Sequence, residues 1–361
     1  MGNLEKSREI INRVDKEIAR LFEERMGACI ELAKFKKEHG LSIYDKKRED
    51  EILQRAKNQV ESSEIAEYYV SLLEKIMSLS KSYQERYIEG MKVAYCGTEG
   101  AFAHIATMKL FKSARAIAYP SFQDAYFAVV NGECDSAVLP VENSYNGEVG
   151  QVTDFMFSGP LFVNSMTELA VSQDLLVLPG TRLEDLKLVL SHPQALGQCA
   201  DFITENKLKT QEYTNTALAA KFVRENGDKT IAAIASAEAA EIFGLEVLAR
   251  NINSSRSNTT RFAVFSRAPL KRSDEEKGVH SIFLFTVRNE AGALAKAIEI
   301  IGKHGFNMRT LRSRPMKELL WEYYFYVEAE GYIDSEDGAE MMKELSKYCD
   351  RLKFAGTYLK T

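Results

Sequence analysis

The first ninety residues contain no proline and only four glycines, which favours long helices in this segment. Apolar residues recur there at helical spacing, which predicts a first helix from about Leu4 to Glu38, ended by Gly40. Shorter helices are expected at about 44–58 and 63–88. A long helix with two short ones cannot bury its apolar stripe alone. We therefore expect this segment to form an intertwined dimer.

From Met91 to about residue 270, short β-rich runs alternate with helical segments. Such alternation predicts parallel sheets flanked by helices. The charged stretch at 271–278 is typical of a linker. Strands are expected at 92–96, 134–141, 170–178, 188–190, 230–235 and 261–266, and helices at 101–112 and 217–226.

The remaining residues, 279–361, follow a βαββαβ pattern, which is typical of a ferredoxin-like split βαβ arrangement. The expected order is a strand, a helix, two strands, a helix and a last strand. Their ranges are 279–287, 292–304, 307–314, 321–330, 337–348 and about 353–359.

Composition excludes several classes of function. The net charge of -5 and the lack of a compact basic run give no basis for binding nucleic acid. No apolar run approaches membrane-spanning length, and the N-terminus lacks the apolar core of a signal peptide. The five cysteines are scattered, and the five histidines show no metal-ligand spacing. We expect a cytoplasmic protein with reduced thiols and no metal or organic cofactor.

Two cations interrupt the apolar face of the first expected helix. At 100° per residue, Arg25 and Lys36 fall on one narrow stripe, because eleven residues make almost three full turns. Arg8 points roughly 100° away from Arg25 by the same geometry. It therefore fits the pocket of a partner chain better than the pocket of its own.

The second and third expected helices carry further polar residues. Asp45, Arg48 and Glu49 share one face, and the apolar stripe of the third helix ends in Ser80 and Gln84. Two oppositely charged side chains on one helix face, taken by themselves, are typical of a solvated salt bridge. Eight polar residues on one three-helix segment favour a shared pocket instead.

The helical segment resembles the all-helical chorismate mutases over its whole length. Arginines suit chorismate, which is a dicarboxylate. Its pericyclic rearrangement requires the compact conformer to be held and negative charge on the breaking ether oxygen to be stabilised. The resemblance makes Lys36 and Gln84 the catalytic candidates at that oxygen. The substrate-binding set that it implies is Arg8, Arg25, Lys36, Asp45, Arg48, Glu49, Ser80 and Gln84.

The other members of that set have expected roles too. Arg25 and Ser80, with Arg8 from a second protomer, are expected to hold carboxylates. Asp45 and Glu49 are expected to fix the region of the ring hydroxyl.

Four motifs mark the middle of the chain: Gly97–His104, Glu142–Ser144, Ser191–Cys199 and Asn258–Phe262. Alone, the first is typical of a tight turn and the second of an Asx-type loop. The third is a proline-broken loop entering a helix, which is how proteins direct backbone N–H groups at an anion. Together they resemble the prephenate dehydratases over roughly 91–268. The resemblance implies two α/β lobes with a cleft, as in periplasmic solute-binding folds, and loops gathered at strand ends.

Dehydration of prephenate removes the ring carboxylate as carbon dioxide and the 4-hydroxyl as water. Thr260 matches the essential threonine of the family, so we assign it to the leaving hydroxyl as the catalytic residue. Arg261 is expected either to bind a carboxylate or to support the loop, and strand alternation favours support. His192 is a general acid or a structural hydrogen-bond donor. The substrate-binding candidates are Asn143, Ser144, His192, Gln194, Gln198 and Arg261.

The last segment resembles the ACT regulatory domains, which bind amino acids at paired interfaces. Its glycine turn at a helix start is expected to take the carboxylate of phenylalanine. Arg312 stands where the family motif has glutamate, which predicts weak phenylalanine inhibition. A purely structural dimerisation module is the alternative. The regulatory candidates are Gly292, Ala293, Leu294, Asn307, Arg312, Ser313 and Arg314.

The sequence thus predicts a multidomain enzyme with a mutase at 1–90, a dehydratase at 91–270 and an ACT domain at 278–361. Their expected classes are all-α, two-lobed α/β and ferredoxin-like α+β. Chorismate is expected to become prephenate and then phenylpyruvate, under feedback control by phenylalanine. Alternatives are an arogenate dehydratase, or a non-catalytic amino-acid or keto-acid sensor. We expect a homodimer or higher homo-oligomer that binds no nucleic acid or membrane.

Overall fold

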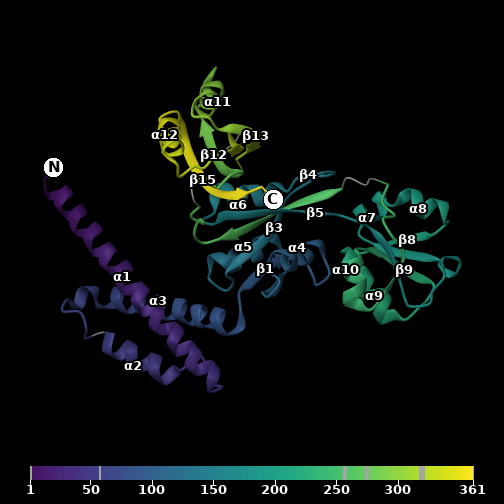
Figure 1. Ribbon diagram of the computed structural model, residues 1–361, viewed down its shortest axis with the longest axis horizontal. Coiled ribbons are helices and arrows are strands. Elements are labelled where there is room, and N and C mark those ends of the chain that lie inside the picture. The colour runs from purple at the N-terminus through teal and green to yellow at the C-terminus, as the bar shows by residue number, and fades with distance from the viewer. Residues whose placement is uncertain (1, 57, 255–257, 273–275, 317–321, 361) are drawn as a thin grey trace. The chain divides into compact units, whose positions relative to one another are not determined.

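The computed structural model describes residues 2–56, 58–254, 258–272, 276–316 and 322–360 (Figure 1). Contacts within it divide the chain into two units. One comprises Met1–Lys92 and Ser113–Arg115, and the other comprises Val93–Lys112 and Ala116–Thr361. Residues 273–275 of the expected linker and the start of the strand expected at 321 lie outside the described residues.

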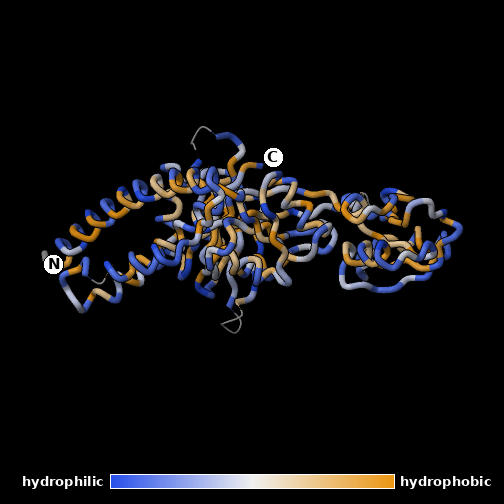
Figure 2. The backbone as a smooth tube through the Cα atoms, turned by 90° about the horizontal axis from the view of Figure 1, so that it is seen from below, coloured by the Kyte–Doolittle hydropathy of each residue, from blue (hydrophilic) through white to orange (hydrophobic). Residues whose placement is uncertain are grey.

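The first unit is helical, as predicted, and consists of α1 (Gly2–Glu38), α2 (Lys46–Ala56) and α3 (Ser63–Glu89). Gly40 ends α1 with a left-handed φ of 62°, and the backbone N–H of Leu41 reaches back to the carbonyl of Lys36 at 2.9 Å. Hydrophobic and hydrophilic residues are mixed along the helix that starts at the N-terminus (Figure 2). The apolar side chains of Ile10 and Ile18 are more than half exposed within the unit.

The second unit contains two sheets. The strand order of the first is β13-β14-β12-β15-β5-β11-β3-β1-β2, with β4 paired to β3, and that of the second is β10-β6-β9-β7-β8. The strands of the central segment in the first sheet are β1 (Lys92–Cys96), β2 (Arg115–Tyr119), β3 (Ser136–Asn143), β4 (Gly147–Glu148), β5 (Phe162–Ala170) and β11 (Thr259–Ser266). Those of the second are β6 (Asp174–Val177), β7 (Leu188–Ser191), β8 (Lys209–Glu212), β9 (Ile231–Ala235) and β10 (Glu246–Ala249).

The expectation of purely parallel sheets is wrong, because both sheets are mixed. β1 pairs with β3 in parallel, but β11 lies between β3 and β5 and is antiparallel to both. β11 returns from the second sheet without a crossover helix, so it enters the first sheet in the opposite direction. β2, β8 and β10, which were not predicted, are edge strands of their sheets, where an apolar run is not required. β5 was not predicted either, although it lies inside the first sheet, and the strand expected at 170–178 is the shorter β6.

Helices cover these sheets, with separate cores beneath them. The helices are α4 (Phe102–Leu110), α5 (Phe122–Val130), α6 (Gly150–Ser158), α7 (Pro193–Gln198), α8 (Ala200–Glu205), α9 (Thr216–Asn226) and α10 (Ala237–Phe243), and a 3₁₀ turn lies at Leu183–Asp185. Neighbouring residues of β6 show how the second sheet is filled: Leu175 packs with the core under α7 and α8, and Leu176 with the core under α9 and α10. Figure 1 shows α8 and α9 beside this sheet.

The last segment has the predicted βαββαβ order: β12 (Val279–Val287), α11 (Ala293–Lys303), β13 (Asn307–Pro315), β14 (Tyr323–Glu330), α12 (Glu336–Leu345) and β15 (Cys349–Leu359). Its strands are ordered β13-β14-β12-β15, and every neighbouring pair is antiparallel. This is the ferredoxin-like arrangement. The last strand begins earlier than expected.

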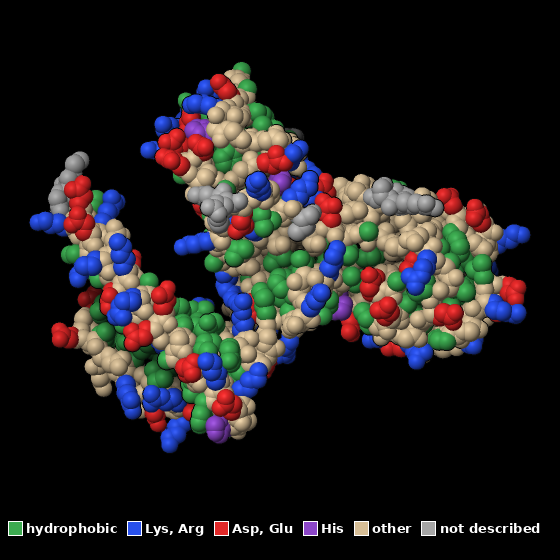
Figure 3. All heavy atoms as spheres, viewed as in Figure 1, with side chains coloured by type: hydrophobic (Ala, Val, Ile, Leu, Met, Phe, Trp, Pro, Cys, Tyr) green, Lys and Arg blue, Asp and Glu red, His purple; other side chains and the backbone are tan. Residues whose placement is uncertain are grey.

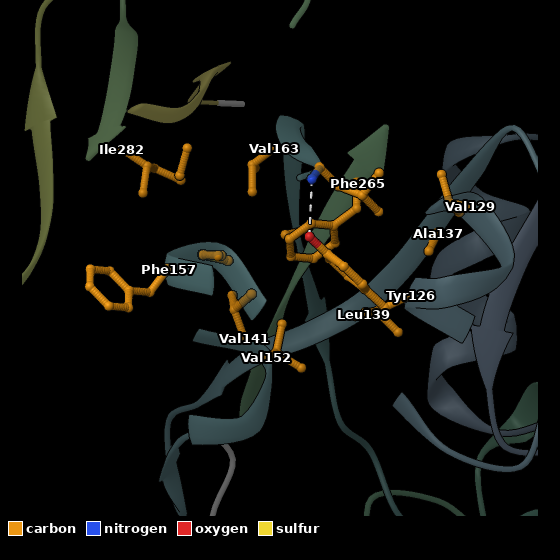
Figure 4. Packing of buried hydrophobic residues seen from close by; sticks show 14 of the residues in the cluster. Tyr126, Val129, Ala137, Leu139, Val141, Val152, Phe157, Val163, Phe265 and Ile282 are labelled. Carbon is orange, nitrogen blue, oxygen red and sulfur yellow. Dashed lines mark hydrogen bonds between the residues drawn. The ribbon is translucent and has the colours of Figure 1, made fainter. Parts of the chain in front are cut away.

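The ferredoxin-like strands join the first sheet edge to edge through β15 and β5. Gly356 lies opposite Val163 there and has a φ of 136°, and a Cβ at Gly356 would overlap the Val163 carbonyl oxygen. The core beneath is continuous, because it includes Phe265 of β11, Ile282 of β12 and Tyr126 of α5 (Figure 4). The Tyr126 hydroxyl accepts a hydrogen bond from the backbone N–H of Leu161 at 3.0 Å, drawn as the dashed line in that figure.

The surface carries charges of both signs. On the face seen in Figure 3, lysine and arginine side chains are interspersed with aspartate and glutamate. None of the helices in the described ranges is both long enough and apolar enough to cross a membrane.

Candidate active sites

In the helical unit, three of the predicted residues meet between α1 and α3. Arg25 contacts the hydroxyl of Ser80, and Ser80 donates to the carbonyl of Ile76 at 2.7 Å. The Gln84 amide donates to the Ser80 carbonyl at 3.2 Å, while its buried oxygen has no hydrogen-bond partner among the described residues. Because a buried polar atom without a partner is costly, this oxygen marks a place where a ligand is able to bind.

The predicted residues near α2 engage other partners. The Lys36 ammonium donates to the carbonyl of Ile43 at 2.7 Å. The Asp45 carboxylate caps α2 by accepting the backbone N–H of Arg48 at 3.0 Å. The side chain of Arg48 forms an exposed pair with Glu51, of the kind that contributes little to stability.

Glu49 contacts a residue that sequence reasoning missed. Its carboxylate lies 3.0 Å from the ammonium of Lys81, which also stands 5.3 Å from the ring centre of Tyr44. Lys81 directly follows Ser80 at the polar end of α3, and that position was the available signal. Arg8, which was expected to serve a partner, is exposed on α1.

In the α/β segment, a cavity of about 420 Å³ receives five of the predicted dehydratase residues. Asn143, His192, Gln194, Gln198 and Thr260 all line it. Two predicted residues, Ser144 and Arg261, do not. Apolar side chains that also line the cavity are Phe102, Phe122, Pro140, Val149 and Val171.

Asn143 holds Thr260 across two neighbouring strands, because the two residues lie opposite each other in the β3–β11 ladder. The Asn143 amide nitrogen donates to Thr260 Oγ1 at 2.9 Å, to Asn258 Oδ1 at 2.8 Å and to the Thr259 carbonyl at 3.3 Å. Its oxygen accepts the backbone N–H groups of Tyr145 and Asn146, each at 3.0 Å. With its hydrogen-bonding capacity used in this way, Asn143 holds Thr260 in place on the cavity wall.

Ser144 supports the same strand end. Its hydroxyl accepts the backbone N–H of Thr259 at 2.9 Å, and its own N–H donates to the Thr259 carbonyl at 2.8 Å. These two bonds fix the chain one residue before Thr260.

His192 caps the six-residue helix α7. Its Nδ1 accepts the backbone N–H of Gln194 at 3.2 Å, so this N–H is not available to an anion. An accepting Nδ1 places the ring proton on Nε2. With Nδ1 engaged in this way, the ring nitrogen left to face a ligand is Nε2.

Gln198 contacts a second residue that the sequence reasoning missed. Gln173 lines the cavity, is 3% exposed, and its amide nitrogen lies 3.4 Å from Gln198 Oε1. The oxygen of Gln173 has no partner among the described residues. Gln173 lies just outside β6, and no motif marks it.

The cavity contains no lysine or arginine among its described lining residues, so Arg261, which was among the substrate-binding candidates, does not line it. Its one carboxylate, Glu148, lies 3.4 Å from the Arg314 guanidinium, which partly offsets its charge. α4 and α6 begin on the cavity wall at Ala101 and Val149, and no side chain caps either helix. Uncapped helix N-termini favour anions.

Arg261 lies on the opposite side of the strand from Thr260 and lines another cavity, of about 220 Å³. Its guanidinium pairs with both oxygens of Glu328 at 3.0 and 3.1 Å and lies 3.1 Å from the Tyr358 hydroxyl. Burial lowers the pKa of Arg261, but the Glu328 carboxylate outweighs it and the net pKa is raised. Two roles were predicted for Arg261, binding a carboxylate and supporting the loop. This geometry favours the supporting role.

The predicted regulatory residues fall into two groups. Gly292 starts α11 in a left-handed conformation with φ 86°, followed by Ala293, and Leu294 lines a cavity of about 630 Å³. Asn307 donates to Glu330 at 2.8 Å. Ser313 lies opposite Phe325 in the β13–β14 ladder.

Arg312 and Arg314 instead contact the α/β segment. Arg312 contacts the carboxylate of Glu142, and Arg314 lies 3.2 Å from the carboxylate of Asp154. The Tyr324 hydroxyl donates to the same Asp154 oxygen at 2.7 Å. Strand β13 therefore carries two arginines that bind outside the ferredoxin-like segment.

The described residues contain no group of three or more histidine, cysteine, aspartate or glutamate side chains able to hold a metal ion. The five cysteines are all free thiols.

Comparisons with known proteins match the helical unit and the α/β segment to two different families. The type II chorismate mutase family model matches residues 7–85, and the prephenate dehydratase family model matches residues 93–270. The bifunctional chorismate mutase/prephenate dehydratase of Aquifex aeolicus is 32% identical, and the match covers 100% of this chain and 99% of that protein.

Two solved structures match the part after the helical unit. One, titled as a novel type of quorum quenching acylase, GqqA, is 32% identical with a TM-score of 0.69, covering 75% of this chain and 98% of its own. The other, prephenate dehydratase of Arthrobacter aurescens in complex with L-Phe, is 26% identical with a TM-score of 0.67, covering 74% of this chain and 90% of its own. With both family models and a full-length relative matched, the chain belongs to the bifunctional chorismate mutase/prephenate dehydratase family.

Proposed function

We propose that this enzyme rearranges chorismate to prephenate in its helical unit and then converts prephenate to phenylpyruvate in the 420 Å³ cavity, as a step toward phenylalanine. The observation that carries the second reaction is the Asn143–Thr260 hydrogen bond on the cavity wall. Family membership and the match over the full length support the pairing of both activities on one chain.

For the mutase, the meeting of Arg25, Ser80 and Gln84 supports a pocket between α1 and α3. The reaction needs no proton carrier, so positioning and charge stabilisation account for catalysis. Lys36 and Gln84 are assigned to the ether oxygen, and Arg25 to a carboxylate. The exposed apolar stripe of α1 supports a dimer in which Arg8 of a second copy completes the site.

For the dehydratase, the direction of one hydrogen bond supports a donor role for Thr260. Asn143 donates to Thr260 Oγ1, so the threonine hydroxyl accepts there and directs its own proton elsewhere. We assign that proton to a hydrogen bond with the departing 4-hydroxyl. The Nε2–H of His192 is assigned as a further hydrogen-bond donor on the wall.

Conversion of prephenate to phenylpyruvate breaks one C–C bond and one C–O bond. The ring carboxylate leaves as carbon dioxide, and its C–C electron pair completes the aromatic ring while the C–O bond to the 4-hydroxyl breaks. That hydroxyl takes up one proton and leaves as water. The apolar wall formed by Phe102, Phe122 and Val171 leaves the departing carboxylate poorly solvated. The retained carboxylate is assigned to the uncapped N-termini of α4 and α6.

The ferredoxin-like segment is proposed to be an ACT domain that binds phenylalanine at the Gly292 turn. The bound L-Phe in the Arthrobacter relative supports this proposal. Since Arg312 contacts Glu142, its side chain is engaged away from that turn, in keeping with weak inhibition. Titrating phenylalanine against the dehydratase rate tests this point. Tight inhibition would contradict it.

The experiment that tests the function supplies purified protein with chorismate, prephenate or arogenate separately. Phenylpyruvate is followed by its absorbance in alkali for the first two, and phenylalanine is measured for arogenate, which keeps its amino group. Accumulation of prephenate without phenylpyruvate would contradict the dehydratase. Faster turnover of arogenate than of prephenate would show that the enzyme is an arogenate dehydratase. If none of the three compounds is turned over, the non-catalytic sensor is the remaining alternative.

Two variants test the partition between the sites. Lys36→Ala is expected to lose at least 100-fold of mutase activity and to keep the dehydratase, and Thr260→Val to do the reverse. Thr260→Ser, which keeps the hydroxyl, is the matched control. Equal loss of both activities in either variant would contradict separate sites.

A further inference from the structure

The strands that hold Thr260 expose a second row of residues on their other face. Thr260 lies opposite Asn143, and Arg261 lies opposite Glu142. Because side chains alternate along a strand, the first pair faces the substrate cavity and the second pair faces away from it. The second pair contacts the ferredoxin-like segment.

These contacts are charged and largely buried. Glu328 of β14 is 3% exposed and holds the Arg261 guanidinium through both carboxylate oxygens. The Tyr326 and Tyr358 hydroxyls donate to the same carboxylate. Paired charges with fully used oxygens hold a defined geometry, because any displacement leaves a buried charge uncompensated.

Two further ion pairs, both made by Glu142, complete the charged cluster. Glu142 lies 3.4 Å from Arg261 and contacts Arg312 of β13. The cluster therefore contains two guanidinium groups and two carboxylates. One member of each charge comes from the strands of the dehydratase cavity, and the others come from the ferredoxin-like segment.

The backbone beneath this cluster is irregular. Arg261 pairs with Glu142 but Phe262 pairs with Pro140, so Val141 is an extra residue in β3. A bulge interrupts the ladder and leaves the local geometry less constrained by backbone hydrogen bonds. The charged cluster lies at this bulge, where β11 is paired regularly with β5 on its other side.

We propose that Glu328 and Arg312 are positioning residues for the dehydration reaction. They hold Arg261 and Glu142 from behind the strands and thereby set the geometry of Thr260 and Asn143. The proposal rests on the dehydratase activity proposed above. It gives the ferredoxin-like segment a role in basal catalysis that is separate from any effector binding.

The test compares Glu328→Gln and Arg312→Gln with the unchanged full-length enzyme. Glu328→Gln keeps the shape but cannot balance Arg261, so kcat for prephenate is expected to fall at least tenfold while KM stays within threefold. Arg312→Gln, at the more exposed pair, is expected to lower kcat about threefold, and Arg312→Lys to restore it. Mutase activity of the same chains is expected to remain unchanged.

Glu344→Gln is the matched control, because Glu344 pairs with Lys303 and His304 inside the ferredoxin-like segment and is expected to leave kcat within twofold. If Glu328→Gln fails to fold, Tyr358→Phe removes one hydroxyl from the cluster and is expected to lower kcat two- to fivefold.

Three results would overturn the proposal: folded variants with unchanged kcat, a change confined to KM, or an equal loss of mutase activity. If the unchanged enzyme does not turn over prephenate, the dehydratase assignment itself fails. If it does and the variants match it, only the positioning role fails.

Discussion

Asn143→Asp is the most direct test of how the dehydratase cavity orients its threonine. The substitution preserves size and keeps the oxygen that accepts the Tyr145 and Asn146 N–H groups. It replaces the amide donor by an acceptor. A carboxylate there draws the Thr260 hydroxyl proton toward itself, so the hydroxyl no longer donates to the substrate.

The expected loss follows from the bonds removed. The donor contacts at 2.8 Å to Asn258 and 2.9 Å to Thr260 disappear. Each is worth roughly 0.5–1.5 kcal/mol, and a buried group left unsatisfied costs about 1–3 kcal/mol. A combined cost of about 2–4 kcal/mol in the transition state corresponds to about 30- to 1,000-fold in rate.

The assay measures kcat for phenylpyruvate formation from prephenate, with thermal unfolding and mutase activity of the same chain as controls. Asn164→Asp is the matched variant, because Asn164 donates to the Ala268 carbonyl and accepts from Leu270 outside the cavity. We expect it to leave kcat unchanged. A folded Asn143→Asp enzyme with kcat within threefold of the unchanged one would refute the assigned hydrogen-bond direction.

Two further predictions concern the stability of the second unit. Gly356→Ala is expected to lower its unfolding free energy by at least about 1–3 kcal/mol, measured by denaturant titration, because alanine is strained at φ 136° and its Cβ meets Val163; an unchanged midpoint would show that β15 and β5 separate readily. The second prediction is acid sensitivity. Burial raises the pKa of Glu328, but Arg261 and three hydrogen bonds outweigh it, so the net pKa lies below the ordinary 4.5. Its stabilising contribution is therefore present above pH 4.5 and lost as pH falls through the lowered pKa. Unfolding free energy followed from pH 6 to pH 3 should fall more steeply in the unchanged protein than in Glu328→Gln, and equal slopes would contradict this.

Sequence patterns predicted the helices and strands that are determined by residues close together in the chain. Gly40 ends α1 because a left-handed residue is needed there, and the βαββαβ order follows from changes between helical and strand periodicity. The direction of β11 was not predictable in this way. Its pairing with β3 and β5 depends on where the chain returns after the whole second sheet.

The candidate site shows the same limit. The motifs identified Asn143 and Thr260 separately, but their hydrogen bond joins residues 117 positions apart. Alternation along the strand favoured a supporting role for Arg261 over carboxylate binding, without indicating Glu328 as its partner. Gln173 and Glu148 line the cavity without belonging to a motif, so only the fold reveals them.

The absence of cationic side chains from the described cavity wall has the same origin. Composition and motifs describe side chains, whereas the groups proposed here to bind an anion are backbone N–H groups at the starts of α4 and α6. Almost any sequence that forms a helix provides such groups. Where the helices begin in space decides whether they bind an anion, and that depends on the packing of the whole lobe.

Arg312 shows why a departure from a family motif cannot be interpreted at one position. Against the motif alone, an arginine in place of glutamate is a defect in effector binding. In the fold it is one of two cations that balance Glu142 and Glu328 beside Arg261. Glutamate at 312 would place three carboxylates around a single guanidinium, at a site where one of them is buried. The positive charge at position 312 is thus tied to the negative charge of Glu142. A chain with glutamate at position 312 needs a different cationic partner for one of these two carboxylates.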